Sequence, residues 1–108
     1  MWPNMGSKMN KLPKTDKIYV LVRGDLSKSA QAVQAGHALA ELIMQRGVRP
    51  DVWTGTLVYL KVQHEEELKR WLRDVPEGVP FYEPDLGNSL TAIATMNKEK
   101  GFENLRLL

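Results

Sequence analysis

The apolar residues of this chain form short runs that predict four strands. Residues 17–22 include five consecutive apolar residues, mostly β-branched or aromatic, which is typical of a central strand covered on both faces. Residues 56–62 form a second apolar run, and 80–83 a short third strand before a tight loop at 84–88. Polar and apolar residues alternate over 90–96, which indicates a fourth strand.

Helical spacing predicts two helices between these strands. Residues 27–46 are rich in alanine, which would let a helix lie close against a sheet. Ser27 or Ser29 can accept hydrogen bonds from the free N–H groups at its start, and Gly47 stands where a left-handed cap is expected. Residues 65–73 carry two leucines four positions apart, so one face of that helix is apolar.

The resulting order, β-α-β-α-β-β, predicts a single α/β domain over residues 17–108. Helical crossovers favour parallel pairing, while the short connection between the last two strands favours an antiparallel pair. A mixed four-stranded sheet flanked by helices follows. Residues 1–16 show no periodicity and are expected to be disordered. The predicted core consists of Ile18, Val20, Val22, Val58, Leu60 and Ile93, packed against Val33, Leu42 and Leu68.

Composition narrows the classes of function. The 108 residues suit one domain, and the absence of cysteine excludes disulfides, thiolate catalysis and cysteine-based zinc sites. No stretch reaches the roughly 20 apolar residues of a membrane span. The lysines near the start are not followed by an apolar segment, so we expect no secretory signal, no membrane partner and a cytoplasmic location.

The positive charge is concentrated at the start of the chain. The net charge of the chain is +2. Residues 1–17 alone have a net charge of +3, so the remaining residues sum to −1. A basic tail can attract a polyanion such as RNA. For the tail itself we favour the simpler interpretation of a solvated, disordered end.

His37 is the first candidate for chemistry. Gln34 lies one turn before it on the same helical face, and Gly36 beside it gives up helix stability that alanine would supply. His37 could act on a proton or a phosphate, with Gln34 orienting it or a water molecule. The alternative, which spacing alone favours, is a surface histidine beside a hydrogen-bonded glutamine. His64 is interpreted as an ordinary surface or capping residue.

Two further candidates lie near the end of the chain. Glu83 and Asp85 flank a proline, which restricts both acids and could position a base and an orienting group. An aspartate in a turn and solvated acids are the alternative interpretation. Thr91 could line a pocket beside Asp85, although threonine also simply suits a strand.

Metal and nucleotide motifs are missing. Neither His37 nor His64 has a carboxylate at helical ligand spacing together with a second histidine. No Walker, dinucleotide-binding, Gly-x-Ser-x-Gly or kinase pattern occurs. We therefore expect no metal site.

Taken in order, these segments resemble type-two peptidyl-tRNA hydrolases, and most closely the shorter relatives in that family. The strand and turn Tyr19-Val-Leu-Val-Arg-Gly-Asp-Leu26 precede a helix with Gln34-Ala-Gly-His37-Ala38. The family shows a hydrophobic strand, Arg-x-Asp-Leu, and a helix with Gln-x-x-His-Ala. The block Glu83-Pro-Asp-Leu-Gly-Asn-Ser-Leu-Thr-Ala-Ile-Ala94 is similar to its acidic loop followed by Thr-x-Ile-Ala. The resemblance extends from Lys17 to about Met96.

The resemblance implies hydrolysis, without a cofactor, of the ester that joins a peptide to the 3′ ribose of tRNA. It makes tRNA the expected partner, and the sequence leaves a homodimer open. By position, Gln34 and His37 correspond to the family's helix pair, Asp85 to its acidic loop residue, and Thr91 to its strand threonine. Two departures are clear. The family's lysine about two turns before the histidine is absent, and Lys28 is the nearest basic residue. The loop between Asp85 and Thr91 is also shorter than in the well-studied enzymes.

Ester hydrolysis needs a base and a group that stabilises the oxyanion. Asp85 or His37 could remove the proton, and Thr91 or backbone N–H groups of the loop at 87–88 could stabilise the oxyanion. The residues expected to bind substrate are Arg23, Asp25, Lys28, Gln34, Glu83, Asn88 and Thr91, with Arg23 and Lys28 holding phosphates.

Two other classes of function stay open: a non-catalytic RNA- or nucleotide-binding module and a protein-interaction domain. A folded surface that gathers Arg23, Lys28, Arg46 and Lys98 on one side would favour the hydrolase or the RNA-binding module. If the third strand runs parallel to the first, His37 and the loop at Asp85 should meet in one cleft, although about fifty residues separate them.

Overall fold

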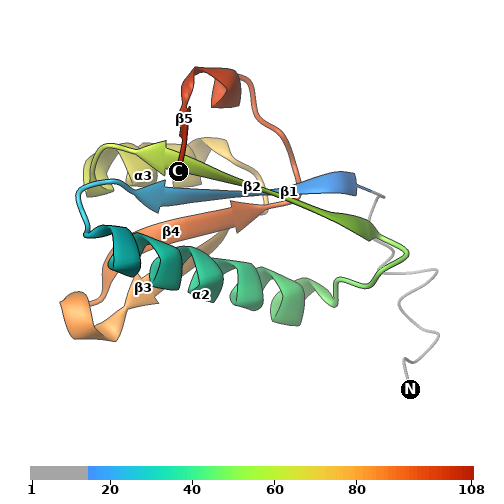
Figure 1. Cartoon of the computed structure of the whole chain (residues 1–108), viewed down its shortest axis with the longest axis horizontal. Coiled ribbons are helices and arrows are strands. Elements are labelled where there is room, and N and C mark those ends of the chain that lie inside the picture. The colour runs from blue at the N-terminus through green and yellow to red at the C-terminus, as the bar shows by residue number, and fades with distance from the viewer. Residues whose placement is uncertain (1–14) are drawn as a thin grey trace.

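The computed structural model describes residues 15–108, which form a sheet with a helix on each face (Figure 1). The main helices are α2 and α3, and single 3₁₀ turns, η1 and η2, precede β4 and β5. In chain order the bounds are β1 Thr15–Arg23, α2 Lys28–Arg46, β2 Trp53–Val62, α3 Glu65–Asp74, β3 Val79–Glu83, η1 Pro84–Leu86, β4 Ser89–Thr95, η2 Phe102–Asn104 and β5 Arg106–Leu107.

The strands lie in the order β3-β4-β1-β2-β5. β1 pairs in parallel with β2, and β4 pairs antiparallel with both β1 and β3. Strands β1, β2 and β3 therefore run in the same direction, so their carboxyl ends lie at one edge of the sheet. The predicted mixed α/β sheet is confirmed, with five strands in place of the expected four.

Side chains from the sheet form two cores, one under each helix. Ile18, Val20 and Val22 pack with Ala35, Ala38 and Leu42 beneath α2. On the other face, Tyr19, Leu21, Leu60 and Ile93 pack with Leu68 of α3 and with Phe102. Because successive strand residues point to opposite faces, β1 contributes to both layers. The expected single core is therefore divided in two, and β1 lies between the halves.

The prediction that Val33 belongs to the core is wrong, since this residue is 54% exposed. The buried positions of α2 are spaced three and four residues apart, at positions 31, 34, 35, 38 and 42. Val33 lies outside that stripe, because each residue advances about 100° around the helix. Two of the buried positions are glutamines, so part of the inward face of α2 is polar.

The predicted limits of α2 are confirmed. The Ser27 hydroxyl accepts a hydrogen bond from the Ala30 N–H at 3.2 Å. Gly47 adopts the left-handed conformation with φ +62°, and its N–H donates to the carbonyl of Ile43. At α3, His64 is the N-cap, as interpreted from the sequence, with Nδ1 accepting from the Glu67 N–H.

The two ends of the domain differ from the sequence prediction. Thr15 and Asp16, which were assigned to the tail, begin β1, and the rest of that predicted disordered segment lies outside the described residues. The last dozen residues, expected as a short helix or an irregular tail, form η2 and the strand β5, whose two residues pair with Leu60 and Lys61. None of the helices in residues 15–108 is long and apolar enough to cross a membrane.

Candidate functional site

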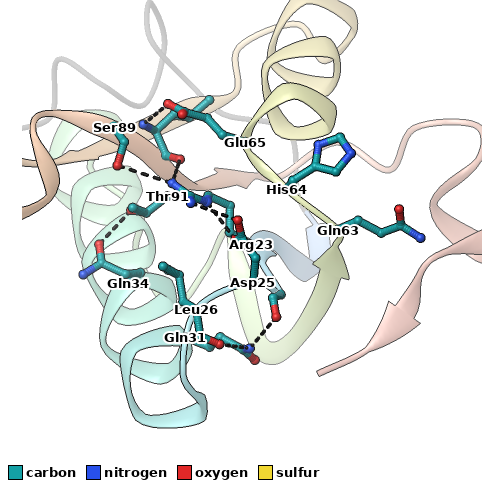
Figure 2. Close-up of polar contacts among 12 residues, drawn as sticks. Arg23, Asp25, Leu26, Gln31, Gln34, Gln63, His64, Glu65, Ser89 and Thr91 are labelled. Carbon is teal, nitrogen blue, oxygen red and sulfur yellow. Dashed lines mark hydrogen bonds and ion pairs between the residues drawn. The ribbon is translucent and has the colours of Figure 1, made fainter.

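The candidate site lies at the edge of the sheet where β1 and β3 end. Arg23 closes β1 and Glu83 closes β3, while α2 begins just after β1 and β4 begins just after β3. Since β1 and β3 run in the same direction, these four element ends meet at one edge. Figure 2 shows Arg23, Gln34 and Ser89 at this edge in close-up. The condition set in the sequence analysis, that the third strand runs parallel to the first, is thus met, and the segments around His37 and Asp85 lie at the same edge of the sheet.

Gln34 connects three elements through its side-chain amide. Its Nε2 donates to Glu83 Oε1 at 2.7 Å, across 49 positions of sequence. Its Oε1 accepts from the Thr91 hydroxyl at 2.7 Å, across 57 positions. The Thr91 hydroxyl also lies 3.3 Å from the Phe81 carbonyl. Gln34 and Thr91 are only 5% and 0% exposed, so these hydrogen bonds hold α2 against β3 and β4. The amide of Gln34 therefore orients Glu83 and not His37.

Glu83 is the acid that this network holds. The hydrogen bond from Gln34 is the main cause that lowers the pKa of Glu83 below its ordinary value. The Asp85 N–H, which donates to Glu83 Oε2 at 3.2 Å, and the nearby charge of His37 act in the same direction. The carboxylate is consequently stabilised in its ionised form, which makes it a weak base and a good fixed anion.

His37 lies one turn beyond Gln34 and is exposed. Its ring stacks on Phe81 of β3, with ring centroids 4.4 Å apart and planes 4° from parallel. The stacking fixes the plane of the imidazole over β3. His37 is close enough to Glu83 for its charge to act on that carboxylate, and the Asp85 N–H donates to the same carboxylate. Within residues 15–108, no hydrogen bond joins the side chains of His37 and Asp85.

The loop at 84–88 holds Asp85 on a short rigid turn. The Gly87 N–H donates to the Pro84 carbonyl at 3.3 Å, and the Asn88 N–H donates to the Glu83 carbonyl at 2.9 Å. Gly87 and Asn88 both have left-handed φ values, +64° and +59°. The expectation that these backbone N–H groups stabilise an oxyanion is therefore wrong for this conformation, because the turn itself uses them. The side chains of Asp85 and Asn88 are exposed.

Arg23 is engaged within the protein. Its guanidinium forms two hydrogen bonds to the Asp25 carboxylate, at 2.9 and 3.0 Å, and reaches the Ser89 hydroxyl at 3.3 Å. Hydrogen bonding to Arg23 lowers the pKa of Asp25, and the same contact raises the pKa of Arg23. Asp25 thus compensates the charge of Arg23, and Arg23 joins the end of β1 to the start of β4. Its expected role as a phosphate ligand stays a prediction.

The four cations considered from the sequence do not gather on one side. Lys28 is exposed at the start of α2. Arg46 lies at the opposite end of the same 19-residue helix, where it pairs with Glu77 at 2.9 Å. Lys98 follows the far end of β4. This criterion therefore gives no support for a single basic face built from these residues.

Three residues at the site were not expected. Gln31 Nε2 donates to the carbonyls of Gly24 and Leu26, at 3.2 and 2.7 Å, and ties the turn after β1 to α2. Glu65 accepts from the Leu90 N–H at 2.8 Å, which anchors the start of β4 to α3. Phe81 stacks against the imidazole ring of His37. The sequence could have indicated Gln31, since it stands three residues before Gln34 on the same helical face. The partners of Glu65 and Phe81 depend on tertiary contacts, which no local sequence pattern indicates.

Within residues 15–108, no group of three or more histidine, cysteine or acidic side chains is arranged to hold a metal ion. Comparison with protein-family models found no match, and comparison with curated proteins found none either.

Proposed function

We propose that this protein is a peptidyl-tRNA hydrolase, which cleaves the ester between a peptide, or an N-blocked aminoacyl group, and the 3′ ribose of tRNA. One observation carries the proposal: Gln34 joins Glu83 and Thr91. Gln34 belongs to the first sequence block on which the resemblance rests, and Glu83 and Thr91 belong to the last. A partly buried hydrogen-bond network unites the two blocks.

The chemistry we propose uses the two exposed groups beside Glu83. Asp85 removes a proton from water as the water oxygen attacks the ester carbonyl carbon. The bond to the ribose 3′ oxygen then breaks, and His37 donates the proton that this oxygen needs. Glu83 stays ionised because its pKa is lowered, so it serves as a fixed anion beside the His37 imidazole.

Recognition of the tRNA end is assigned to exposed side chains around this centre. Lys28 supplies a positive charge at the start of α2 that forms no ion pair within residues 15–108, and the amide dipoles of the helix also favour an anion there. Asn88 offers a side-chain amide next to Asp85, which can donate to the oxyanion in place of the occupied backbone N–H groups.

The test is release of free tRNA from N-acetyl-aminoacyl-tRNA by the purified protein. We expect His37→Ala and Asp85→Asn each to lower kcat by about 100-fold or more, because each removes a proton-transfer group. Asp74→Asn is the matched control, since Asp74 is an exposed aspartate at the end of α3. Circular dichroism should show that all three variants keep the fold. No release above the spontaneous rate by the unmodified protein would overturn the proposal.

A second candidate, a tRNA-binding module without hydrolysis, is favoured by one observation. The backbone N–H groups of Gly87 and Asn88 are used within the turn, which leaves fewer donors for an oxyanion. This alternative predicts that the same preparation retains N-acetyl-aminoacyl-tRNA on a filter while the ester stays intact.

A further inference from the structure

A groove of about 400 Å³ lies at the same edge of the sheet, on the side of β2 and β5. Its walls come from the turn after β1, the end of β2, the start of α3 and the segment from η2 to β5. It takes no part in the Gln34 network. The lining residues are Gly24, Lys61, Val62, Gln63, Glu67, Asn104, Leu105 and Arg106.

Two positive charges face this groove from neighbouring strands. Lys61 and Arg106 are directly paired across β2 and β5, so their side chains leave the same face of the sheet. Like charges in directly opposite positions repel each other. No ion pair within residues 15–108 involves either side chain. An anion between them would relieve that repulsion.

Glu67 is the acidic residue in the lining of the groove, and one of its carboxylate oxygens already accepts a hydrogen bond. Its Oε1 accepts a hydrogen bond from the Gln63 N–H at 2.8 Å. One carboxylate against two cations leaves the lining with a net positive charge. The side chains of Gln63 and Asn104 add neutral amides, which can donate hydrogen bonds to phosphate oxygens or contact a base.

Gly24 makes room for one of the two cations. A Cβ atom at this position would come within 2.6 Å of the Lys61 side-chain carbons and 2.9 Å of the Val62 carbonyl oxygen. The Gly24 N–H also donates to that carbonyl at 2.7 Å, which binds the turn to the end of β2. The aliphatic part of Lys61 therefore packs directly over the glycine, and the turn holds it at the groove.

We propose that this groove binds a backbone phosphate of the tRNA strand, with Lys61 and Arg106 as its two cationic ligands. The proposal rests on the proposed function for the identity of the nucleic acid. The volume lies in the range of pockets that hold a small ligand, so one nucleotide can enter with its phosphate between the two cations. The Arg23–Leu26 turn separates this phosphate from the ester site, and Figure 2 shows Gln63 and Gln34 on opposite sides of Asp25.

The test is binding of deacylated tRNA by the full chain, measured by fluorescence anisotropy over a range of salt concentrations. In Lys61→Gln/Arg106→Gln we expect affinity at low salt to fall by about tenfold or more. The slope of log K against log salt should become shallower by about 1.4 to 1.8, because two phosphate contacts and their released counterions are lost. Arg70→Gln/Lys100→Gln is the control with the same change of charge, since both residues are exposed and lie outside the groove.

Equal affinities and equal slopes for the groove variant and the control would overturn the proposal. So would tight binding of adenosine monophosphate in the groove that tRNA does not displace, because the site would then take a free nucleotide. Hydrolysis of N-acetyl-aminoacyl-tRNA separates this result from the proposed function. A raised KM with unchanged kcat in the groove variant supports both. Salt-dependent tRNA binding through the groove by a protein that never cleaves the ester supports the groove and refutes the hydrolase.

Discussion

Single buried polar residues determine how the site is held together, and Thr91 is the clearest example. Its hydroxyl is fully buried and donates to Gln34, so Thr91→Val leaves an amide oxygen that is itself buried without its donor. We expect the free energy of unfolding to fall by about 1–3 kcal/mol. Urea denaturation measures this, and Thr56→Val, at an exposed position of β2, is the control. Equal stabilities of the two variants would show that the Gln34 network adds nothing to the fold.

Glu83 makes part of the stability depend on pH. Its pKa is lowered in the folded protein, so its contribution is complete above the pKa of the unfolded chain and is lost as the pH falls through the folded value. Glu83→Gln keeps a hydrogen-bond acceptor but removes the charge. The difference in Tm between the unmodified protein and this variant should therefore be larger near pH 7 than near pH 3. A difference that stays constant over this range would contradict the assignment.

The sequence indicated which residue types matter at the site but not all of their partners. Gln34 and Thr91 were recognisable because a glutamine on an alanine-rich face and a threonine in an apolar strand stand out. That they hydrogen-bond each other depends on where β4 lies against α2, which no local pattern encodes. The stacking of His37 on Phe81 is equally a product of packing.

At the scale of elements, the ends of α2 are encoded locally and can be tested locally. Ser27→Ala removes the hydroxyl that accepts from the Ala30 N–H and should cost about 1 kcal/mol. Ser29→Ala is the comparison, because Ser29 is the second residue of the helix and contacts the Ser27 hydroxyl at 3.4 Å without being the N-cap. Gly47→Ala should cost about 1 kcal/mol, since alanine is disfavoured at φ +62°. Chemical denaturation measures all three, and a Ser29→Ala loss equal to that of Ser27→Ala would contradict the cap.

The same scale shows where sequence patterns become too short to interpret. The four longer strands were predicted to within a few residues, because each carries a run of apolar side chains or an alternation of polar and apolar ones. β5 has two residues, both exposed, so no periodicity marks it. It exists because Leu60 and Lys61 leave backbone groups at the edge of β2 for pairing. The groove lined by Lys61 and Arg106 could therefore not be predicted from the sequence.

At the scale of the whole molecule, the sheet divides the interior into two cores that should unfold together. Leu42→Ala and Leu68→Ala each empty a fully buried site on opposite faces. Each should lower the free energy of unfolding by about 2–5 kcal/mol within a single transition. Met44→Ala, at a 69% exposed position of α2, should change it little. Two separate transitions in either leucine variant, followed by circular dichroism and tryptophan fluorescence, would show that the layers fold independently.

The direction of the strands is what brings distant sequence segments to one edge. The alternation of strands and helices favoured parallel pairing but left the direction of β3 open, so a common edge for Arg23, Glu83 and Asp85 was expected only on the condition that β3 runs parallel to β1. The pairing of β4 with both β1 and β3 fulfils that condition. The single shared cleft between His37 and Asp85 was a finer expectation. Glu83 interacts with both, through the charge of His37 and the N–H of Asp85, and the shared cleft itself stays a prediction.

The most direct test of the central claim is hydrolysis of N-acetyl-aminoacyl-tRNA in ¹⁸O-labelled water, with mass spectrometry of both products. Attack of water on the ester carbonyl places the label in the carboxylate of the released N-acetyl amino acid and leaves the 3′ hydroxyl of the tRNA unlabelled. We predict this pattern at a rate that rises in proportion to the protein concentration and is lost in Asp85→Asn. Label in the tRNA, or release no faster than in buffer alone, would contradict the assignment of this protein as a peptidyl-tRNA hydrolase.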